Sequence, residues 1–182
     1  MISWRSVKMN RVYMGIDPGS KGFITVMTEK GIIFFSIEDN DFYRISNFLQ
    51  EMKETYPNIV CVMEEVHSIF GSSAKATFSF GEINGLLKGL LIANKIPYHL
   101  VQPKKWQSEI WEFKDLVVSY KDVVIKGKET KKKEVNTKQT SLNSASRLFP
   151  NIDFRKNERC KKTDDNKIDS LLIAEYGRRK NL

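Results

Sequence analysis

The sequence predicts an α/β fold: a mixed five-stranded sheet, with its first three strands antiparallel, flanked by helices on both faces. Short apolar β segments alternate along the chain with longer segments of helical periodicity. The first three β segments are joined only by turn-forming residues, as in an antiparallel meander. The chain of 182 residues is 41% apolar, which suffices for the core of one domain.

The three β segments at the start are short and end at glycine or proline. Val12, Met14 and Ile16 alternate in the first segment, which Pro18-Gly19 stops. Glu29-Lys30-Gly31 forms a tight turn between the second and third. The meander is therefore expected to comprise strands at 11–17, 22–28 and 32–37.

A helix and a fourth strand follow the meander. Asn40 or Asp41 can cap the helix, and Pro57-Asn58 ends it. The helix, expected over 41–54, has apolar residues at helical spacing: Phe42, Ile45, Phe48, Leu49 and Met52. The short apolar run 59–63 predicts a strand that leads into Glu64-Glu65.

The rest of the chain adds three helices, a fifth strand and an insertion. Ser72 or Ser73 can cap a long helix that ends near Ala93. A strand is expected at 97–101, a helix from Asn136 or Thr137 through Phe149, and a last helix opening at Asp164 or Asp165 and running to about Arg178. We expect a single domain over 1–182, with an N-terminal extension at 1–10 and a Lys-rich insertion at 106–134 that forms a loop or a small hairpin.

The charge is basic and unevenly distributed. The chain has 30 Lys and Arg against 22 Asp and Glu, a net charge of +8. Between Lys104 and Lys138 there are ten lysines and six acids, and 155–162 holds five basic residues and one acid. Each cluster alone could be an ordinary solvated surface. Together they favour a polyanionic partner such as nucleic acid.

Several classes of protein are excluded by composition. No apolar run is long enough to cross a membrane, and the start lacks the features of a secretion signal. Cys61 and Cys160 are too few for a disulfide framework, and with His67 and His99 they do not form a structural zinc motif. A reducing, intracellular location is therefore expected.

Five acidic residues occupy positions that the predicted fold can bring together. Asp17 ends the first strand, Glu64 ends the fourth, and Asp164, Asp165 and Asp169 lie in the first turns of the last helix. Each could be a turn former, a helix cap or a solvated strand end. Converging carboxylates repel one another unless they bind a cation, and Mg²⁺, with Mn²⁺ as its expected substitute, prefers such oxygen ligands. Two such ions can catalyse phosphodiester hydrolysis.

Three segments resemble the RuvC-type Holliday junction resolvases of the RNase H-like superfamily. Gly15-Ile-Asp17-Pro-Gly-Ser20 resembles the opening strand of that family, and Met63-Glu64-Glu65-Val66 its second acidic motif. Asp169-Ser-Leu-Leu-Ile-Ala174 resembles its final helix. The resemblance covers roughly 12–103 and 136–179. It implies an RNase H-like fold and an Mg²⁺-dependent, homodimeric endonuclease that makes paired nicks in four-way or other branched DNA.

The resemblance also implies roles for individual residues. Asp17, Glu64 and Asp169 match the metal-binding acids of the family; the fourth acid is Asp164 or Asp165, since Asn166 stands where many members have Asp or His. Lys138 resembles a basic residue near the scissile phosphate, with Lys104 and Lys105 as weaker candidates. Further candidates for DNA contact are Lys131, Lys132, Lys133, His67 and Phe70; the family has an aromatic wedge where this chain has His67.

The resemblance extends to the assembly and the setting of the protein. The long helix carries Gly81, Gly85 and Gly89 at four-residue intervals, and in the family this helix pairs two subunits. The short chain is most similar to the bacteriophage branch, which implies DNA recombination or repair in the cytoplasm of a bacterium or an infected host cell. Two alternatives remain open: another RNase H-like nuclease, such as one that cleaves RNA–DNA hybrids, or a non-catalytic nucleic-acid-binding protein.

Overall fold

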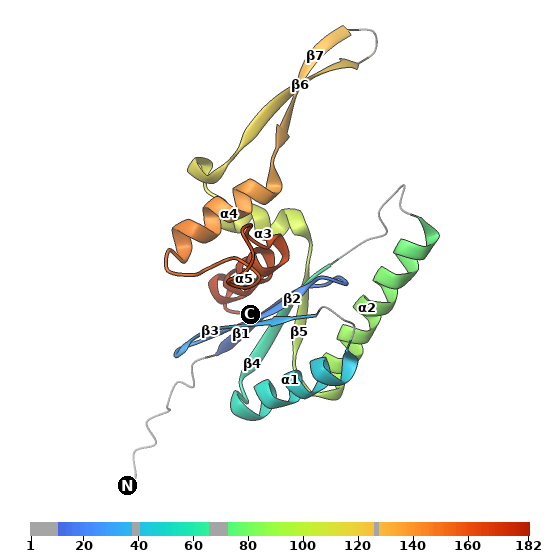
Figure 1. Ribbon diagram of the computed structural model, residues 1–182, viewed down its shortest axis with the longest axis vertical. Coiled ribbons are helices and arrows are strands. Elements are labelled where there is room, and N and C mark those ends of the chain that lie inside the picture. The colour runs from blue at the N-terminus through green and yellow to red at the C-terminus, as the bar shows by residue number, and fades with distance from the viewer. Residues whose placement is uncertain (1–10, 38–40, 66–72, 126–127) are drawn as a thin grey trace.

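The computed structural model describes residues 11–37, 41–65, 73–125 and 128–182. Its centre is a five-stranded sheet in the order β3-β2-β1-β4-β5 (Figure 1). Strand β1 pairs antiparallel with β2 and parallel with β4. Strand β2 pairs antiparallel with β3, and β4 pairs parallel with β5. The strands are β1 (Val12–Asp17), β2 (Phe23–Thr28), β3 (Gly31–Ser36), β4 (Ile59–Glu64) and β5 (Tyr98–Val101). The predicted mixed sheet with an antiparallel start is confirmed.

Helices cover both faces of the sheet. On one face lie α1 (Phe42–Thr55) and α2 (Ala74–Ala93), which pack on the apolar side chains of β1, β2 and β4. On the other face α5 (Asp165–Lys180) crosses β1, β2 and β4, and α3 (Pro103–Ile110) and α4 (Thr137–Leu148) pack beside it (Figure 1). Two apolar cores therefore form, one on each side of the central strands.

The predicted caps begin the helices. The side chain of Asp41 accepts a hydrogen bond from the backbone N–H of Arg44 at the start of α1. The side chain of Ser73 accepts a hydrogen bond from the backbone N–H of Ala76 at the start of α2, and that of Asn136 accepts one from the backbone N–H of Gln139 at the start of α4. Each cap satisfies an N–H that has no partner inside its helix, which fixes where the helix begins.

Gly15 lets α5 lie directly against β1. A Cβ atom at this position would be 2.1 Å from the carbonyl oxygen of Ser170 and 2.4 Å from the backbone nitrogen of Ala174. Both atoms belong to the helix backbone, so no side-chain rotation could relieve the contact. The absence of a side chain at Gly15 thus determines how closely the first turns of α5 approach the end of β1.

We predict that Gly15→Val destabilises the protein by about 3 kcal/mol or more, because the new side chain must push α5 off the sheet. Urea unfolding followed by circular dichroism measures the loss. Gly19→Ala is the control in the same segment, since no atom of the described residues lies within 4 Å of its Cβ position. That control should change stability by less than about 0.5 kcal/mol. Equal stability of Gly15→Val and the wild type would contradict this close packing.

The predicted insertion at 106–134 contains more structure than a loop. Its first residues belong to α3, a helix that the sequence analysis did not predict, with Pro103 at its first turn. A short 3-10 helix, η2 (Phe113–Asp115), follows. The remainder is a two-stranded ribbon of β6 (Val118–Ile125) and β7 (Lys128–Val135), so the hairpin alternative is correct. Among the described residues, no helix is long and apolar enough to span a bilayer.

Candidate metal centre

Asp17 and Glu64 are the last residues of two neighbouring parallel strands, and their side chains lie on the same face of the sheet. Ile16 of β1 pairs with Met63 of β4, so the two acids are the next residues along each strand. Side chains alternate between faces along a strand. Gly15 and Val62 face α5, because α5 atoms lie against both of them. Asp17 and Glu64, two residues further on, therefore also lie on the α5 side.

Helix α5 brings Asp169 to the same place. Asp169 precedes Ser170, whose backbone oxygen lies against Gly15. The hydroxyl of Ser141 on α4 hydrogen-bonds the Asp169 carboxylate and lowers its pKa. The other carboxylate oxygen, Oδ1, is buried and has no hydrogen-bond partner among the residues that the structure describes. A buried carboxylate oxygen without a donor is costly to keep, so this atom is suited to a cation.

Burial and neighbouring acids raise the pKa values of Asp17 and Asp169. Burial raises the pKa of Asp17 well above its usual value, and the charges of Asp169, Glu64 and Asp164 raise it further. Burial, with charges that include Glu64, raises the pKa of Asp169 to about 7. Burial also raises the pKa of Glu64. The charges of Glu64 and Asp169 therefore act at Asp17, and burial disfavours the ionised forms of all three acids without a counter-charge.

Asp164 and Asp165 have different partners. Asp164 caps α5, and its Oδ1 accepts hydrogen bonds from the backbone nitrogens of Asn166 and Lys167 at 3.0 and 3.1 Å. Its charge also acts on Asp17. Asp165 forms an ion pair of 2.7 Å with Lys138 at the start of α4. The charge of Asp165 acts on Asp169, as expected for residues one helical turn apart.

Trp106 contacts the site, and the sequence analysis did not identify it. Its indole Nε1 donates a hydrogen bond of 2.8 Å to Glu64 Oε1, and its side chain is fully buried on α3. The bond lowers the pKa of Glu64, opposing the effect of burial. Pro103 at the first turn and the apolar pair Trp106 and Ile110, four residues apart, were the available signals of this helix.

We predict that Trp106→Phe weakens divalent-metal binding about 10-fold, because Glu64 loses the donor that orients it. Half-maximal thermal stabilisation by Mn²⁺ measures the effect. Trp111→Phe is the matched control, since Trp111 packs edge-on against Trp106 but its buried Nε1 has no hydrogen-bond partner. If both variants shift the Mn²⁺ midpoint equally, the effect comes from packing and not from the hydrogen bond to Glu64.

The other predicted contact residues lie at varying distances from the acids. Lys104 and Lys105 are exposed in the first turn of α3, next to Trp106. Lys131, Lys132 and Lys133 are exposed on β7, on the ribbon that projects from the body of the protein (Figure 1). His67 and Phe70 lie outside the described residues.

The site could hold a divalent ion, although its side chains do not form a complete coordination shell. In the described part of the chain, no three His, Cys, Asp or Glu side chains already surround one position suited to an ion. Mg²⁺ typically takes few carboxylates and completes its shell with water and substrate phosphate. The donors here are all hard oxygens, and the unpartnered oxygen of Asp169 is the one most in need of a cation.

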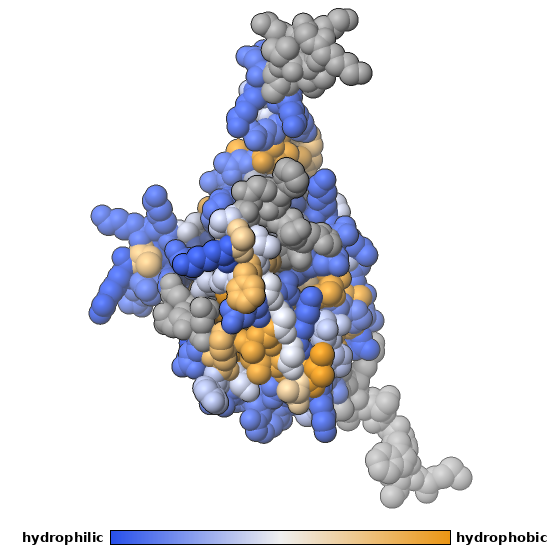
Figure 2. Space-filling view, turned by 90° about the vertical axis from the view of Figure 1, so that its right-hand side faces the viewer, coloured by the Kyte–Doolittle hydropathy of each residue, from blue (hydrophilic) through white to orange (hydrophobic). Residues whose placement is uncertain are grey.

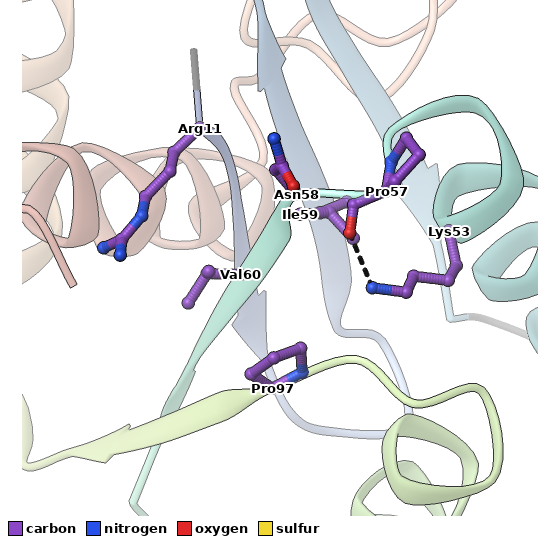
Figure 3. Close-up of a pocket in the computed structure, with 7 residues that line it drawn as sticks. All are labelled: Arg11, Lys53, Pro57, Asn58, Ile59, Val60 and Pro97. Atoms are coloured by element: carbon purple, nitrogen blue, oxygen red, sulfur yellow. Dashed lines mark hydrogen bonds between the residues drawn. The ribbon is translucent and has the colours of Figure 1, made fainter. Parts of the chain in front are cut away.

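One cavity of about 390 Å³ lies at the opposite end of the sheet, where β4 begins. Its two cationic side chains are already engaged. Lys53 donates to the Pro57 carbonyl oxygen at 2.7 Å (Figure 3), and Arg11 donates to the Asn181 carbonyl oxygen at 3.1 Å. The cavity is thus remote from the acids. Its lining residues are Arg11, Lys53, Pro57, Asn58, Ile59, Val60 and Pro97.

The sheet order and the helices on its two faces define an RNase H-like fold, which confirms the predicted fold class. No protein-family model and no curated protein matches the chain. Solved structures do match. RuvC of Thermus thermophilus in complex with a Holliday junction substrate has a TM-score of 0.61 at 13% identity, over 94% of this chain and 95% of that one.

Two further structures share the fold. A second Thermus thermophilus RuvC structure matches with a TM-score of 0.52 at 13% identity, over 93% of this chain and 96% of that one. The yeast mitochondrial Holliday junction resolvase Ydc2 matches with a TM-score of 0.50 at 16% identity, over 91% of this chain and 77% of that one. At these identities the likeness establishes the fold, and the activity of this chain has to be argued from its own residues.

Proposed function

We propose that this protein is a metal-dependent, structure-selective DNA endonuclease that resolves Holliday junctions or other branched DNA by paired nicking. The observation that carries the proposal is that Asp17 and Glu64, at the ends of β1 and β4, lie close to Asp169 in the first turns of α5, in a protein of net charge +8. Carboxylates repel the phosphates of a polyanionic substrate unless bound cations neutralise them. A metal site for such a substrate therefore accounts for acidic residues that are surrounded by lysines. A bacteriophage origin and a role in DNA recombination or repair are part of the proposal.

The carboxylates would act as ligands of two Mg²⁺ ions. When bound, the metal supplies activation of water and neutralisation of the charge that develops on the scissile phosphate. Trp106 orients Glu64 through its hydrogen bond, and Ser141 orients Asp169. In this proposal Lys138 contacts the scissile phosphate, and the products carry 5′-phosphate and 3′-hydroxyl ends.

For the fourth ligand we favour Asp164 over Asp165. The charge of Asp164 acts on Asp17, and its Oδ1 binds the backbone, which holds the carboxylate in a fixed orientation. Asp165 instead binds Lys138 and would keep that lysine beside the site. Asp164→Asn should therefore weaken Mn²⁺ binding, whereas Asp165→Asn should leave Mn²⁺ binding nearly unchanged.

Cleavage of a synthetic four-way junction with mapped cut positions tests the function. The proposal expects symmetric nicks on two opposing strands in the presence of Mg²⁺, none with EDTA, and little cutting of linear duplex. Preferential cleavage of an RNA–DNA hybrid would instead support the second RNase H-like activity. Junction binding without cleavage under any divalent ion would support a non-catalytic binding protein.

Paired nicking requires two active sites, and α2 offers a surface for a homodimer. No described atom lies within 4 Å of a Cβ added at Gly81, Gly85 or Gly89, and Phe78 and Ile92 on the same helix are 75% and 64% exposed. In the view of Figure 2, pale and orange residues run down the middle of the face that carries α2. A second helix could approach closely over the glycines.

We predict a species of twice the 21.1 kDa chain mass in sedimentation velocity. Gly85→Leu should shift the protein to the monomer, because the new side chain blocks the close approach. Glu51→Gln, on exposed α1 surface, should leave the dimer intact. A wild-type protein that sediments only as a monomer, with or without DNA, would contradict the dimer.

A further inference from the structure

The ribbon formed by β6 and β7 is a separate two-stranded sheet, and within the described residues it is not part of the layers around the central sheet. Its two strands pair with each other along eight register positions, from Val118 opposite Val135 to Ile125 opposite Lys128. The ribbon projects away from the sheet and its helices (Figure 1). A two-stranded hairpin that stands alone in water is marginally stable, so its retention calls for a partner or a function.

The base of the ribbon is fixed firmly and stands beside the acidic site. Asn136 donates its backbone N–H to the Val117 carbonyl oxygen at 2.9 Å, and the Val117 N–H donates to Thr140 Oγ1 at 3.1 Å. Strand β7 ends one residue before the cap of α4, and α4 carries Lys138 in its first turn. A polymer held at the acids therefore passes close to the base of the ribbon.

A second anchor holds η2, which leads into the ribbon. Arg147 on α4 contacts the Asp115 carboxylate at 2.6 Å and the Ile110 carbonyl oxygen at 3.1 Å. Ser144 also donates a hydrogen bond to Asp115, at 2.8 Å. These bonds lower the pKa of Asp115 to about 2, so the anchor stays charged at neutral pH. The ribbon is thus attached rigidly at both of its ends.

The ribbon is cationic on both faces. Residues 118–135 contain six lysines and three acids. Residues directly opposite in an antiparallel pair share a face. One face carries Tyr120 opposite Lys133 and Asp122 opposite Lys131, and the other carries Lys121 opposite Lys132. In Figure 2, hydrophilic side chains cover much of the described outer part of the ribbon.

This arrangement is unfavourable for the ribbon alone. Lys121 and Lys132 are directly opposite like charges, which destabilise a sheet, and Lys121 is only partly compensated by its 2.6 Å ion pair with Glu134. Edge lysines also discourage aggregation, but that purpose does not require cations on both faces. Tyr120 is 66% exposed, and its hydroxyl can donate to phosphate oxygen.

From these observations we infer that the β6–β7 ribbon lies along a duplex arm of the DNA and contacts its phosphates away from the cut. The inference rests on the proposed function for the position of the DNA at the acids. A strand of eight residues is about 26 Å long, which corresponds to roughly eight base pairs at 3.4 Å each. The ribbon therefore extends the contact along the arm to about that distance from the scissile phosphate.

Hydroxyl-radical footprinting of the protein on an uncut four-way junction, in EDTA, tests this inference without requiring catalysis. The wild type should protect one arm out to roughly eight base pairs from the branch. In the triple variant Lys131→Gln, Lys132→Gln, Lys133→Gln the protection should retract toward the branch. A plot of log affinity against log salt concentration has a negative slope, and this slope should become less steep by about 2 to 3. The reason is that each lost phosphate contact removes about 0.9 from its magnitude.

The matched control removes three lysines at the opposite end of the sheet: Lys30→Gln, Lys53→Gln, Lys95→Gln. Its footprint and salt slope should equal those of the wild type. If the ribbon variant keeps the full footprint and slope, the inference is wrong and an acidic protein surface becomes the better partner. Failure of cleavage alone would overturn the proposed function and leave this result unaffected.

Discussion

Asp17→Asn is expected to lower the rate of four-way junction cleavage at least 10³-fold, a loss of about 4 kcal/mol of transition-state stabilisation. Asn keeps the shape of the side chain but removes the negative charge that would hold a divalent ion between β1 and β4. The substitution also removes a repulsion, since neighbouring acids raise the pKa of Asp17 in the folded protein. The variant should therefore fold at least as well as the wild type, and the loss should be one of chemistry.

Single-turnover cleavage with mapped products measures this effect, and a gel-shift assay in EDTA should show junction affinity within a few-fold of the wild type. Glu51→Gln is the control of equal charge change, because Glu51 is exposed on α1, on the other face of the sheet. An Asp17→Asn protein that cuts at the wild-type rate would mean that the acids do not carry the reaction.

The second large effect concerns stability and pH in the absence of metal. Burial raises the pKa of Asp169 to about 7 in the folded protein, whereas an unfolded Asp titrates near 4. Between these values the folded state binds more protons than the unfolded state, so stability should fall as pH rises from about 4 to about 7. Asp115 and Asp153, with pKa values lowered to about 2 by Arg147 and Arg155, stay ionised over this range and do not reverse the trend.

Asp169→Asn should reduce that dependence, to which Asp17 and Glu64 also contribute because burial raises their pKa values, and should stabilise the metal-free protein by on the order of 2–4 kcal/mol at pH 8. Urea unfolding in EDTA at pH 5 and pH 8 makes the comparison. Adding Mg²⁺ at pH 8 should stabilise the wild type and have little effect on the variant. Wild-type stability that rises over this pH range would show that Asp169 is not held in a charge-disfavouring site.

The sheet was predictable because its strands carry their own local signals. The alternation in 12–16, the turn at Glu29-Lys30-Gly31 and the cap residues Asp41 and Ser73 each determine structure within a few residues. Helix α3 was missed for the opposite reason. It is only eight residues long, and the burial of Trp106 and Ile110 that stabilises it depends on α5, far along the chain.

The proximity of the acids was predictable from the sequence, whereas their supporting contacts were not, and the role of the acids as metal ligands stays a prediction. The position of Asp17 and Glu64 at strand ends follows from chain order once β1 and β4 are neighbours. The bond from Trp106 to Glu64 joins residues 42 positions apart, and no local pattern predicts it. The choice between Asp164 and Asp165 depended on the helix cap and on the position of Lys138, which only the tertiary structure defines.

Terbium luminescence gives the most direct test of the central claim that Asp17, Glu64 and Asp169 form one divalent-cation site. Tb³⁺ bound there would lie beside Trp106, whose indole contacts Glu64, and excitation of the indole should sensitise the ion. The account predicts strong sensitised emission that Mg²⁺ displaces and that Asp17→Asn, Glu64→Gln abolishes. Equal emission from that double variant and the wild type would contradict the account.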